Sequence, residues 1–336
     1  MIDKRPKFPF VSVIMPVRNE GAFIAHSLGS VLAQDYSIEC MEVLVVDGMS
    51  DDGTRDVVQR LAGQTAVSVK LIDNPAGIVS PGLNKGIKQA AGEIIMRVDG
   101  HCEIAPNYVA RCVETLRQTG ADCVGGAMVT VGETAVAQAI SSAQSSPFGV
   151  GDVTFRTGCK EGAFVDTLAF GAYRREVFER LGGFDEELVR NQDDEFNFRL
   201  TQAGGKIWLD PAIRSVYYSR ASLPKLWRQY YQYGLYKVRV MQKRRAVAAW
   251  RHLVPGLFVL SIVGSLLLSL VTQQKKWFTL VTTPYIMANL AATTYTARGK
   301  WRIAPILPLA FAVLHSAYGL GFLHGLWHWR GCFRDG

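Results

Sequence analysis

The sequence lacks the features of a zinc protein, of a disulfide-bonded protein and of a secreted precursor. Its six cysteines form no C-x-x-C pair and no other metal-binding spacing, so we expect reduced thiols. They are Cys40, Cys102, Cys112, Cys123, Cys159 and Cys332. The N-terminal stretch MIDKRPKFPFVSVIMP has basic residues but no apolar core followed by a small-residue cleavage site, so we expect no secretory signal. We therefore expect the first 240 residues to stay in the cytosol.

Positive charge is in excess, and its distribution is uneven. The chain has a formal net charge of +8, which fits a nucleic acid, an anionic membrane or a phosphorylated substrate as partner. Residues 237–251, directly before a long apolar run, contain a cluster of basic side chains. These are Lys237, Arg239, Lys243, Arg244, Arg245 and Arg251. A cluster in this position predicts a juxtamembrane segment and no nucleic-acid partner.

Charge is absent from a long stretch that follows. Residues 253–272 carry no charged side chain and would span about 30 Å as a helix, the thickness of a bilayer core. The runs 277–296 and 303–327 are also charge-free but contain prolines. We expect a membrane anchor over 253–330 with three spans, in a multi-pass protein of the cell inner membrane. A buried core helix is the alternative, and a later segment could instead be re-entrant or interfacial.

The N-terminal part shows the rhythm of a parallel α/β sheet. Short apolar runs at 11–15, 42–46, 67–72 and 94–98 predict strands. Residues 21–33, 54–62 and 82–91 between them predict helices, which gives an α/β fold with helices on both faces. Ligands bind such sheets at the carboxyl ends of the strands, here just after Met15, Val46 and Val98.

Polar side chains follow the first two of these strands. Asn19 and Glu20 come after the first, and Asp47 opens the DGMSDDGT run after the second. A carboxylate at this edge can accept hydrogen bonds from a base or a ribose, so we expect a nucleotide there. Asp51 and Asp52 could equally be caps of the next helix.

The fourth strand is followed by a candidate metal site. Asp99 and His101 lie one residue apart in the run RVDGH. A hard oxygen and an imidazole suit Mn²⁺ or Mg²⁺ with a diphosphate, whereas zinc would need further protein ligands. The alternative is a turn aspartate beside a solvated histidine.

Taken together, these segments resemble the family 2 glycosyltransferases. The resemblance implies the GT-A fold, a Rossmann-like fold that binds nucleotide-diphospho-sugars, and a divalent metal. It assigns donor binding to several side chains and the metal to the D-x-H run, in which His101 replaces the more usual aspartate. The matching donor residues are Pro16, Asn19, Glu20, Asp47, Asn84 and Asp99.

The resemblance continues through FGAYRREVFERLGGFDE at 170–186 to RNQDDEFNFRL. When this run is aligned with the family's E-D-x-E-L-x-x-R-L pattern, the resemblance implies that Asp193 is the catalytic base. Gln192 then stands where the family has glutamate. Asp194 is the second candidate for the base. Without the family register, the same acids would be the first turn of a helix.

Residues 222–245 mix aromatic and basic side chains, as expected for a helix in the headgroup layer. We therefore divide the chain into a transferase domain at 1–220, an interfacial segment at 221–252 and the anchor. Arg228 and Gln229 in the interfacial segment are candidates for contacting the acceptor or the diphosphate.

Within the family, this architecture is similar to the transferases of succinoglycan biosynthesis. It implies an inverting enzyme that moves a sugar, with UDP-glucose as the expected donor, onto a lipid-linked oligosaccharide of an exopolysaccharide. A processive polysaccharide synthase is one alternative, although no intact Q-x-x-R-W motif follows the predicted base. A catalytically inactive nucleotide-sugar-binding assembly subunit is another.

Overall fold

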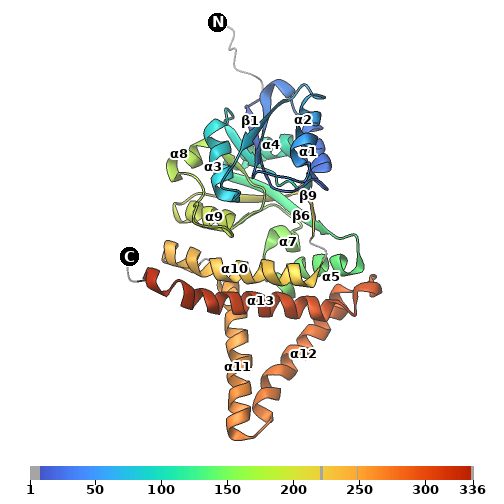
Figure 1. Ribbon diagram of the computed structural model, residues 1–336, viewed down its shortest axis with the longest axis vertical. Helices are drawn as coiled ribbons and strands as arrows, with labels where there is room; N and C mark the ends of the chain where they lie inside the picture. Colours follow the sequence, from blue (N-terminus) through green and yellow to red (C-terminus); the bar gives the residue numbers. More distant parts are fainter. Residues whose placement is uncertain (1–7, 220–221, 248, 334–336) are drawn as a thin grey trace. The chain divides into compact units, whose positions relative to one another are not determined.

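The computed structural model describes residues 8–219, 222–247 and 249–333, and the chain forms two compact units (Figure 1). The first, here called the sheet unit, comprises Met1–Val129 and Gly158–Tyr217. The second, the helical unit, comprises Thr130–Thr157 and Tyr218–Gly336. Five of the six cysteines are free thiols, as expected, and the side chain of Cys332 lies outside the described part.

The sheet unit contains a mixed sheet with the strand order β3-β2-β1-β4-β8-β6-β9-β5, and β7 pairs with β9. The strands β1 to β4 are parallel to one another, whereas β8, β6, β9, β5 and β7 form antiparallel pairs. The strand bounds are β1 Val11–Val17, β2 Met41–Asp47, β3 Ser68–Asp73, β4 Ile94–Arg97, β5 Cys102–Ile104, β6 Cys123–Val131, β7 Ala163–Val165, β8 Ala172–Arg174 and β9 Ile207–Tyr218. The predicted parallel half is confirmed, and the antiparallel half was not predicted.

Helices of the sheet unit connect these strands. Their bounds are α1 Ile24–Leu32, α2 Thr54–Ala62, α3 Val79–Gln89, α4 Tyr108–Thr119, α8 Arg175–Leu181 and α9 Gln192–Gln202, with the short turn η1 at Ile38–Cys40. Helix α3 begins at Val79, earlier than the predicted residue 82, because Pro81 lies in the first turn, where a missing N–H costs nothing. The strand β2 is buried along its whole length and forms the centre of the core.

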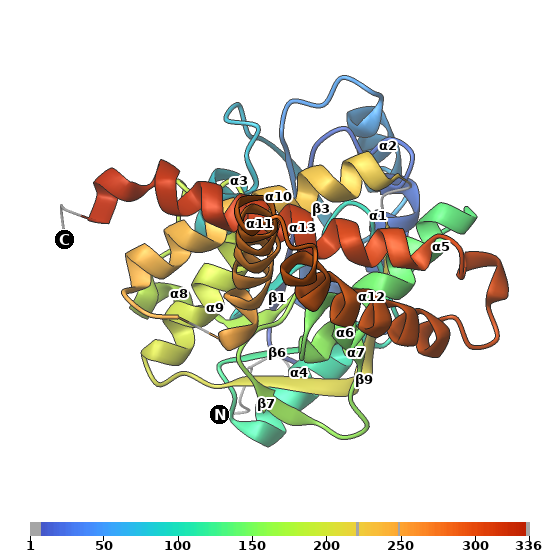
Figure 2. The ribbon, with the colours of Figure 1, turned by 90° about the horizontal axis from the view of Figure 1, so that it is seen from below.

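The helical unit is built from a pair of long helices, a hairpin and three short helices. The bounds are α5 Ala135–Gln144, α6 Pro147–Val150, α7 Thr154–Thr157, α10 Leu223–Arg244, α11 Val254–Thr272, α12 Lys276–Thr296 and α13 Leu307–His328, with turns η2 Trp250–His252, η3 Trp301–Ile303 and η4 Arg330–Phe333. Helices α10 and α13 lie side by side (Figures 1 and 2). Their core includes Leu226, Phe311 and Leu314, together with Ile140 of α5.

Among the described residues, two helical stretches are long and apolar enough to cross a membrane by length and composition, Trp250–Thr272 and Leu307–His328. They correspond to the first and third predicted spans. The middle predicted span is the helix α12, whose threonines make it more polar.

The segment 130–157 differs from the expected division of the chain. The sequence places it within the domain 1–220, but the structure groups it with the helical unit. The reason is the apolar face of α5, where Ala139, Ile140 and Ala143 are buried against α10 and α13. These small and apolar residues need a partner surface, which the two long helices provide.

Candidate active site

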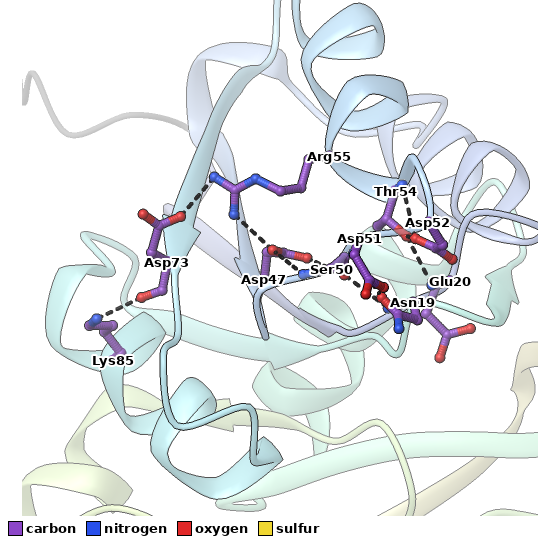
Figure 3. Close-up of polar contacts among 10 residues, drawn as sticks. All are labelled: Asn19, Glu20, Asp47, Ser50, Asp51, Asp52, Thr54, Arg55, Asp73 and Lys85. Carbon is purple, nitrogen blue, oxygen red and sulfur yellow. Dashed lines mark hydrogen bonds and ion pairs between the residues drawn. The ribbon is translucent and has the colours of Figure 1, made fainter.

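The first part of the site is the loop after β2, which a buried carboxylate holds in place (Figure 3). Asp47 is completely buried and accepts hydrogen bonds from the backbone N–H of Ser50 at 3.0 Å and from its hydroxyl at 2.5 Å. Arg55 of α2 forms an ion pair with Asp47 at 2.7 Å and a second one with Asp73 at 2.8 Å. Asp47, predicted to bind the nucleoside, therefore also fixes the loop that would surround it.

The end of β1 is tied to the same loop (Figure 3). Asn19 has φ 54°, a left-handed conformation that asparagine adopts more readily than most residues. Its side-chain oxygen accepts from the N–H of Asp51 at 3.1 Å, and its own N–H donates to the Ser50 hydroxyl at 2.9 Å. The N–H of Glu20 donates to the Thr54 hydroxyl at 2.9 Å. These hydrogen bonds hold the end of β1 next to the loop after β2, as expected for one ligand-binding edge of the sheet.

Pro16 and Asn84 have local structural contacts. Pro16 lies in β1 opposite Val46 of β2. The Asn84 amide of α3 accepts from the N–H of Phe184 at 2.7 Å and donates to its carbonyl at 2.8 Å and to Glu186 at 2.8 Å. Asn84 therefore anchors the GGFDE segment, and its role in donor binding stays a prediction.

An arginine that the sequence analysis missed joins the two predicted chemical centres. Arg97, the last residue of β4, donates from Nε to Asp99 Oδ1 at 2.7 Å and from Nη2 to Asp99 Oδ2 at 3.1 Å. Its Nη1 lies 3.9 Å from Asp193 Oδ2. Asp99 and Asp193, far apart in sequence, are thus neighbours of one guanidinium. The only sequence signal was a charged residue in the otherwise apolar run IIMRV.

The environment of Arg97 is enclosed. Its side chain is only 12% exposed, and within the described part of the chain Nη1 is buried without a hydrogen-bond partner. Burial favours the neutral form, but the carboxylates of Asp99 and Asp193 outweigh it and raise the pKa of Arg97 above its usual value. A charged donor therefore stays next to both acids at any physiological pH.

The predicted metal ligands lie at the turn between β4 and β5. The Nδ1 atom of His101 is 2.8 Å from Glu20 Oε1, and its ring packs edge-on against Tyr217 with the centroids 4.9 Å apart. Asp99 and His101 are each 17% exposed. No cluster of three or more His, Cys, Asp or Glu side chains suited to a metal occurs in the described residues. One carboxylate and one imidazole, both partly accessible, fit an ion that takes its other ligands from a bound diphosphate.

The three acids at the start of α9 have different surroundings. Glu195 is fully buried and forms an ion pair with Arg199 at 3.2 Å. Asp193 is 37% exposed, and its Oδ1 accepts the N–H of Asp194 at 2.9 Å. Asp193 combines partial exposure with proximity to Arg97, as a base that must reach a substrate requires.

The candidates Arg228 and Gln229 belong to α10 of the helical unit. Arg228 is exposed, and the Gln229 amide donates to the Tyr233 hydroxyl at 2.8 Å. A contact of these two residues with the acceptor or the diphosphate stays a prediction.

Comparison with known proteins shows the family of the chain. The profile described as Glycosyl transferase family 2 matches residues 12–182, from β1 through α8. The chain belongs to glycosyltransferase family 2. It is 33% identical to the succinoglycan biosynthesis protein ExoA of Rhizobium meliloti (strain 1021), over 95% of each chain. A second relative, the dolichyl N-acetyl-alpha-D-glucosaminyl phosphate 3-beta-D-2,3-diacetamido-2,3-dideoxy-beta-D-glucuronosyltransferase of Methanococcus voltae, is 28% identical over 94% of this chain and 97% of its own.

Solved structures show the same fold. The mannosyltransferase PcManGT of Pyrobaculum calidifontis, in complex with GDP-Man and Mn²⁺, superposes with a TM-score of 0.58 at 21% identity, covering 97% of this chain and 91% of its own. TarS 1–349 of S. aureus superposes with a TM-score of 0.53 at 20% identity, covering 96% and 92%. The predicted GT-A-like α/β fold of this family 2 member is confirmed.

Proposed function

We propose that this family 2 member is a membrane-bound inverting glycosyltransferase that moves a hexose from a UDP-sugar, with UDP-glucose as the first choice, onto a lipid-linked oligosaccharide during exopolysaccharide synthesis. The observation that carries the proposal is the guanidinium of Arg97, which contacts Asp99 and lies beside Asp193. It brings the predicted leaving-group site and the predicted base into one centre. The names of the ExoA and Methanococcus relatives support a glycan-building reaction with a lipid-linked acceptor.

In this mechanism the loop after β2 and the end of β1 hold the nucleoside. Asp47 and Asn19 fix the loop, so the donor meets a preformed edge and little ordering entropy is lost on binding. Asp193 accepts the proton of the acceptor hydroxyl while that oxygen attacks the anomeric carbon on the face opposite the leaving nucleoside diphosphate. Inversion follows from this single displacement.

Arg97 acts as a positioning residue. Its bidentate contact orients the Asp99 carboxylate, and its guanidinium charge lies beside the carboxylate of Asp193. Asp99 and His101 would hold a Mn²⁺ or Mg²⁺ ion, which when bound would stabilise the charge on the departing diphosphate. Glu20 in turn orients the His101 ring through Nδ1.

The test is a panel of radiolabelled UDP- and GDP-sugars incubated with lipid-linked acceptors and membranes that contain the protein. We expect transfer of one sugar per acceptor from one UDP-sugar in the presence of Mn²⁺. Long polymeric products would identify a processive synthase. Donor binding with neither transfer nor donor hydrolysis would identify an inactive assembly subunit.

A further inference from the structure

The helices α10 and α13 are packed so closely that both must lie at the same depth relative to a membrane. They run parallel, since residues further along α10 meet residues further along α13 (Figure 1). A Cβ atom added to Gly321 would lie 2.0 Å from the carbonyl of Tyr231, and one added to Gly325 would lie 2.7 Å from that of Leu235. Such distances require backbone contact between the helices, which only glycine permits.

Polar contacts fix the register of this pair towards its end. The Tyr231 hydroxyl lies 2.6 Å from His324 Nδ1. The indole N–H of Trp329 donates to the Leu235 carbonyl at 3.2 Å, and the Gln242 amide donates to the Trp329 carbonyl at 3.0 Å. Helix α13 therefore cannot leave α10 without breaking both the glycine contacts and these bonds.

Helix α10 cannot be a membrane span. Helix α10 has 22 residues, and basic residues occur in most turns of its first part and of its last part. These are Lys225, Arg228, Arg239, Lys243 and Arg244, together with Lys237, which is buried within the protein. So many charges are excluded from a bilayer core but suit the headgroup layer. The partner α13 has 44% of its most apolar stretch buried by protein, against 11% for α11. Its apolar character therefore serves the contact with its neighbours.

Helices α11 and α12 form a hairpin that leaves this pair and returns to it. Helix α11 points away from the pair and is seen along its axis in Figure 2. The 19 residues of α11 reach about 28 Å to a turn that ends at Lys275. At the end of α12, Ala297 is buried in the same cluster as Leu226 of α10. The chain therefore comes back to the level from which α11 departed.

Both ends of the hairpin carry the side chains typical of membrane interfaces. Trp250 before α11 is 81% exposed, and Trp301 after α12 is 66% exposed. At the opposite end, Lys276 and Trp277 follow the turn. Tryptophan at both levels marks the two boundaries of a bilayer. Thr279, Thr282 and Thr294 of α12 donate their hydroxyls to carbonyls of their own helix, as Thr282 does to Phe278 at 2.9 Å, which makes these polar groups compatible with lipid.

We propose that the chain crosses the bilayer twice, through α11 and α12, and that α13 is an interfacial helix paired with α10 in the headgroup layer of the cytoplasmic face. The inference rests on the membrane location in the proposed function. The partner of the paired helices is the anionic lipid surface. The helical unit has 17 Lys and Arg residues and 3 Asp and Glu residues, and this topology leaves only Lys275 and Lys276 on the far side.

Cysteine labelling tests this topology. In a variant of the full chain without native cysteines, Gln274→Cys at the hairpin turn and Arg330→Cys after α13 are introduced one at a time. Spheroplasts are treated with a membrane-impermeant maleimide before and after permeabilisation. We expect Gln274→Cys to be labelled in intact spheroplasts, and Arg330→Cys to lose its labelling unless the membrane is opened.

Labelling of Arg330→Cys in intact spheroplasts, together with Gln274→Cys, would overturn the proposal in favour of three spans. Protection of both positions would overturn it in favour of a hairpin that does not reach the far side. Sugar transfer is measured separately in detergent, so a failed topology and a failed enzymatic proposal give different results. If alkaline carbonate released the protein from membranes, the membrane location in the proposed function would be wrong.

Discussion

The two units of this chain carry opposite charge. The sheet unit has 20 Lys and Arg residues against 26 Asp and Glu residues, whereas the helical unit has 17 against 3. The overall excess of +8 therefore comes entirely from the helices. In the proposed function, the acids of the sheet unit include the expected metal ligand Asp99 and the expected base Asp193, and the basic helices would attract a lipid surface. The net charge of a two-unit protein can thus describe neither unit.

The largest expected effect concerns the acids of the sheet unit. Asp193→Asn should lower sugar transfer by about 10²–10⁴-fold, since that is the usual contribution of a positioned base. Donor affinity, measured by calorimetry, should stay close to that of the unmodified enzyme. Asp194→Asn is the matched control and should retain most of its activity. The opposite ranking of the two variants would move the base to Asp194.

The second prediction tests the contact of Arg97 with the carboxylate of Asp99. Arg97→Lys keeps the charge but loses the bidentate contact with Asp99. We expect kcat to fall by about 10–100-fold and the Mn²⁺ concentration for half-maximal activity to rise, as for other residues that orient metal ligands. Manganese affinity is also measured directly from the paramagnetic signal of the free ion. Unchanged manganese affinity would show that Arg97 does not orient Asp99.

A third prediction concerns packing in the helical unit. Gly321→Val should reduce the free energy of unfolding by about 1–3 kcal/mol, because the new side chain would overlap the backbone of α10. Gly264→Val on α11 is the control, since a side chain there meets open space. Thermal unfolding in detergent compares the two. Equal stability of both variants would contradict the close contact between α10 and α13.

The smallest effect tests the attraction to lipid. Lys225→Gln on α10 should weaken binding to vesicles containing phosphatidylglycerol by about 1 kcal/mol, roughly fivefold, and less at high salt. Lys88→Gln on α3 of the sheet unit is the control for a change of net charge. Both lysines are exposed. Equal weakening by the two substitutions would mean that charge acts through the whole molecule and not through the helical unit.

The sequence predicted the parts of the fold that have a strong apolar pattern. Strand β2 is a continuous buried run, β1 is buried except at Pro16, and α11 is a charge-free helix, so each was visible in a short window. The strands β5, β7 and β8 have 3 residues each and show no period. The assignment of 130–157 to the helical unit could not be predicted, because the partners of α5 lie more than 80 residues away in sequence.

For the candidate site, motif spacing identified the acids but not their relation to one another. Nothing in the run IIMRV indicates that Arg97 would reach both Asp99 and Asp193, since this depends on the antiparallel pairing of β4 with β8 and on the start of α9. Likewise, Asp47 was predicted as a ligand for the nucleoside, and its ion pair with Arg55 depends on the packing of α2. Pair contacts of this kind require the tertiary structure.

The placement of α5 has a consequence for biosynthesis. Its buried residues Ala139 and Ile140 contact a cluster that includes Phe311. At the usual translation rate of about 5–20 residues per second, the ribosome needs roughly 10–30 s to reach Phe311 after it has made Ile140. The apolar face of α5 therefore lacks its α13 partner until α11 and α12 have been synthesised. With the proposed topology, the helical unit would complete its folding only at the membrane, and correct delivery of the chain would be a condition for it.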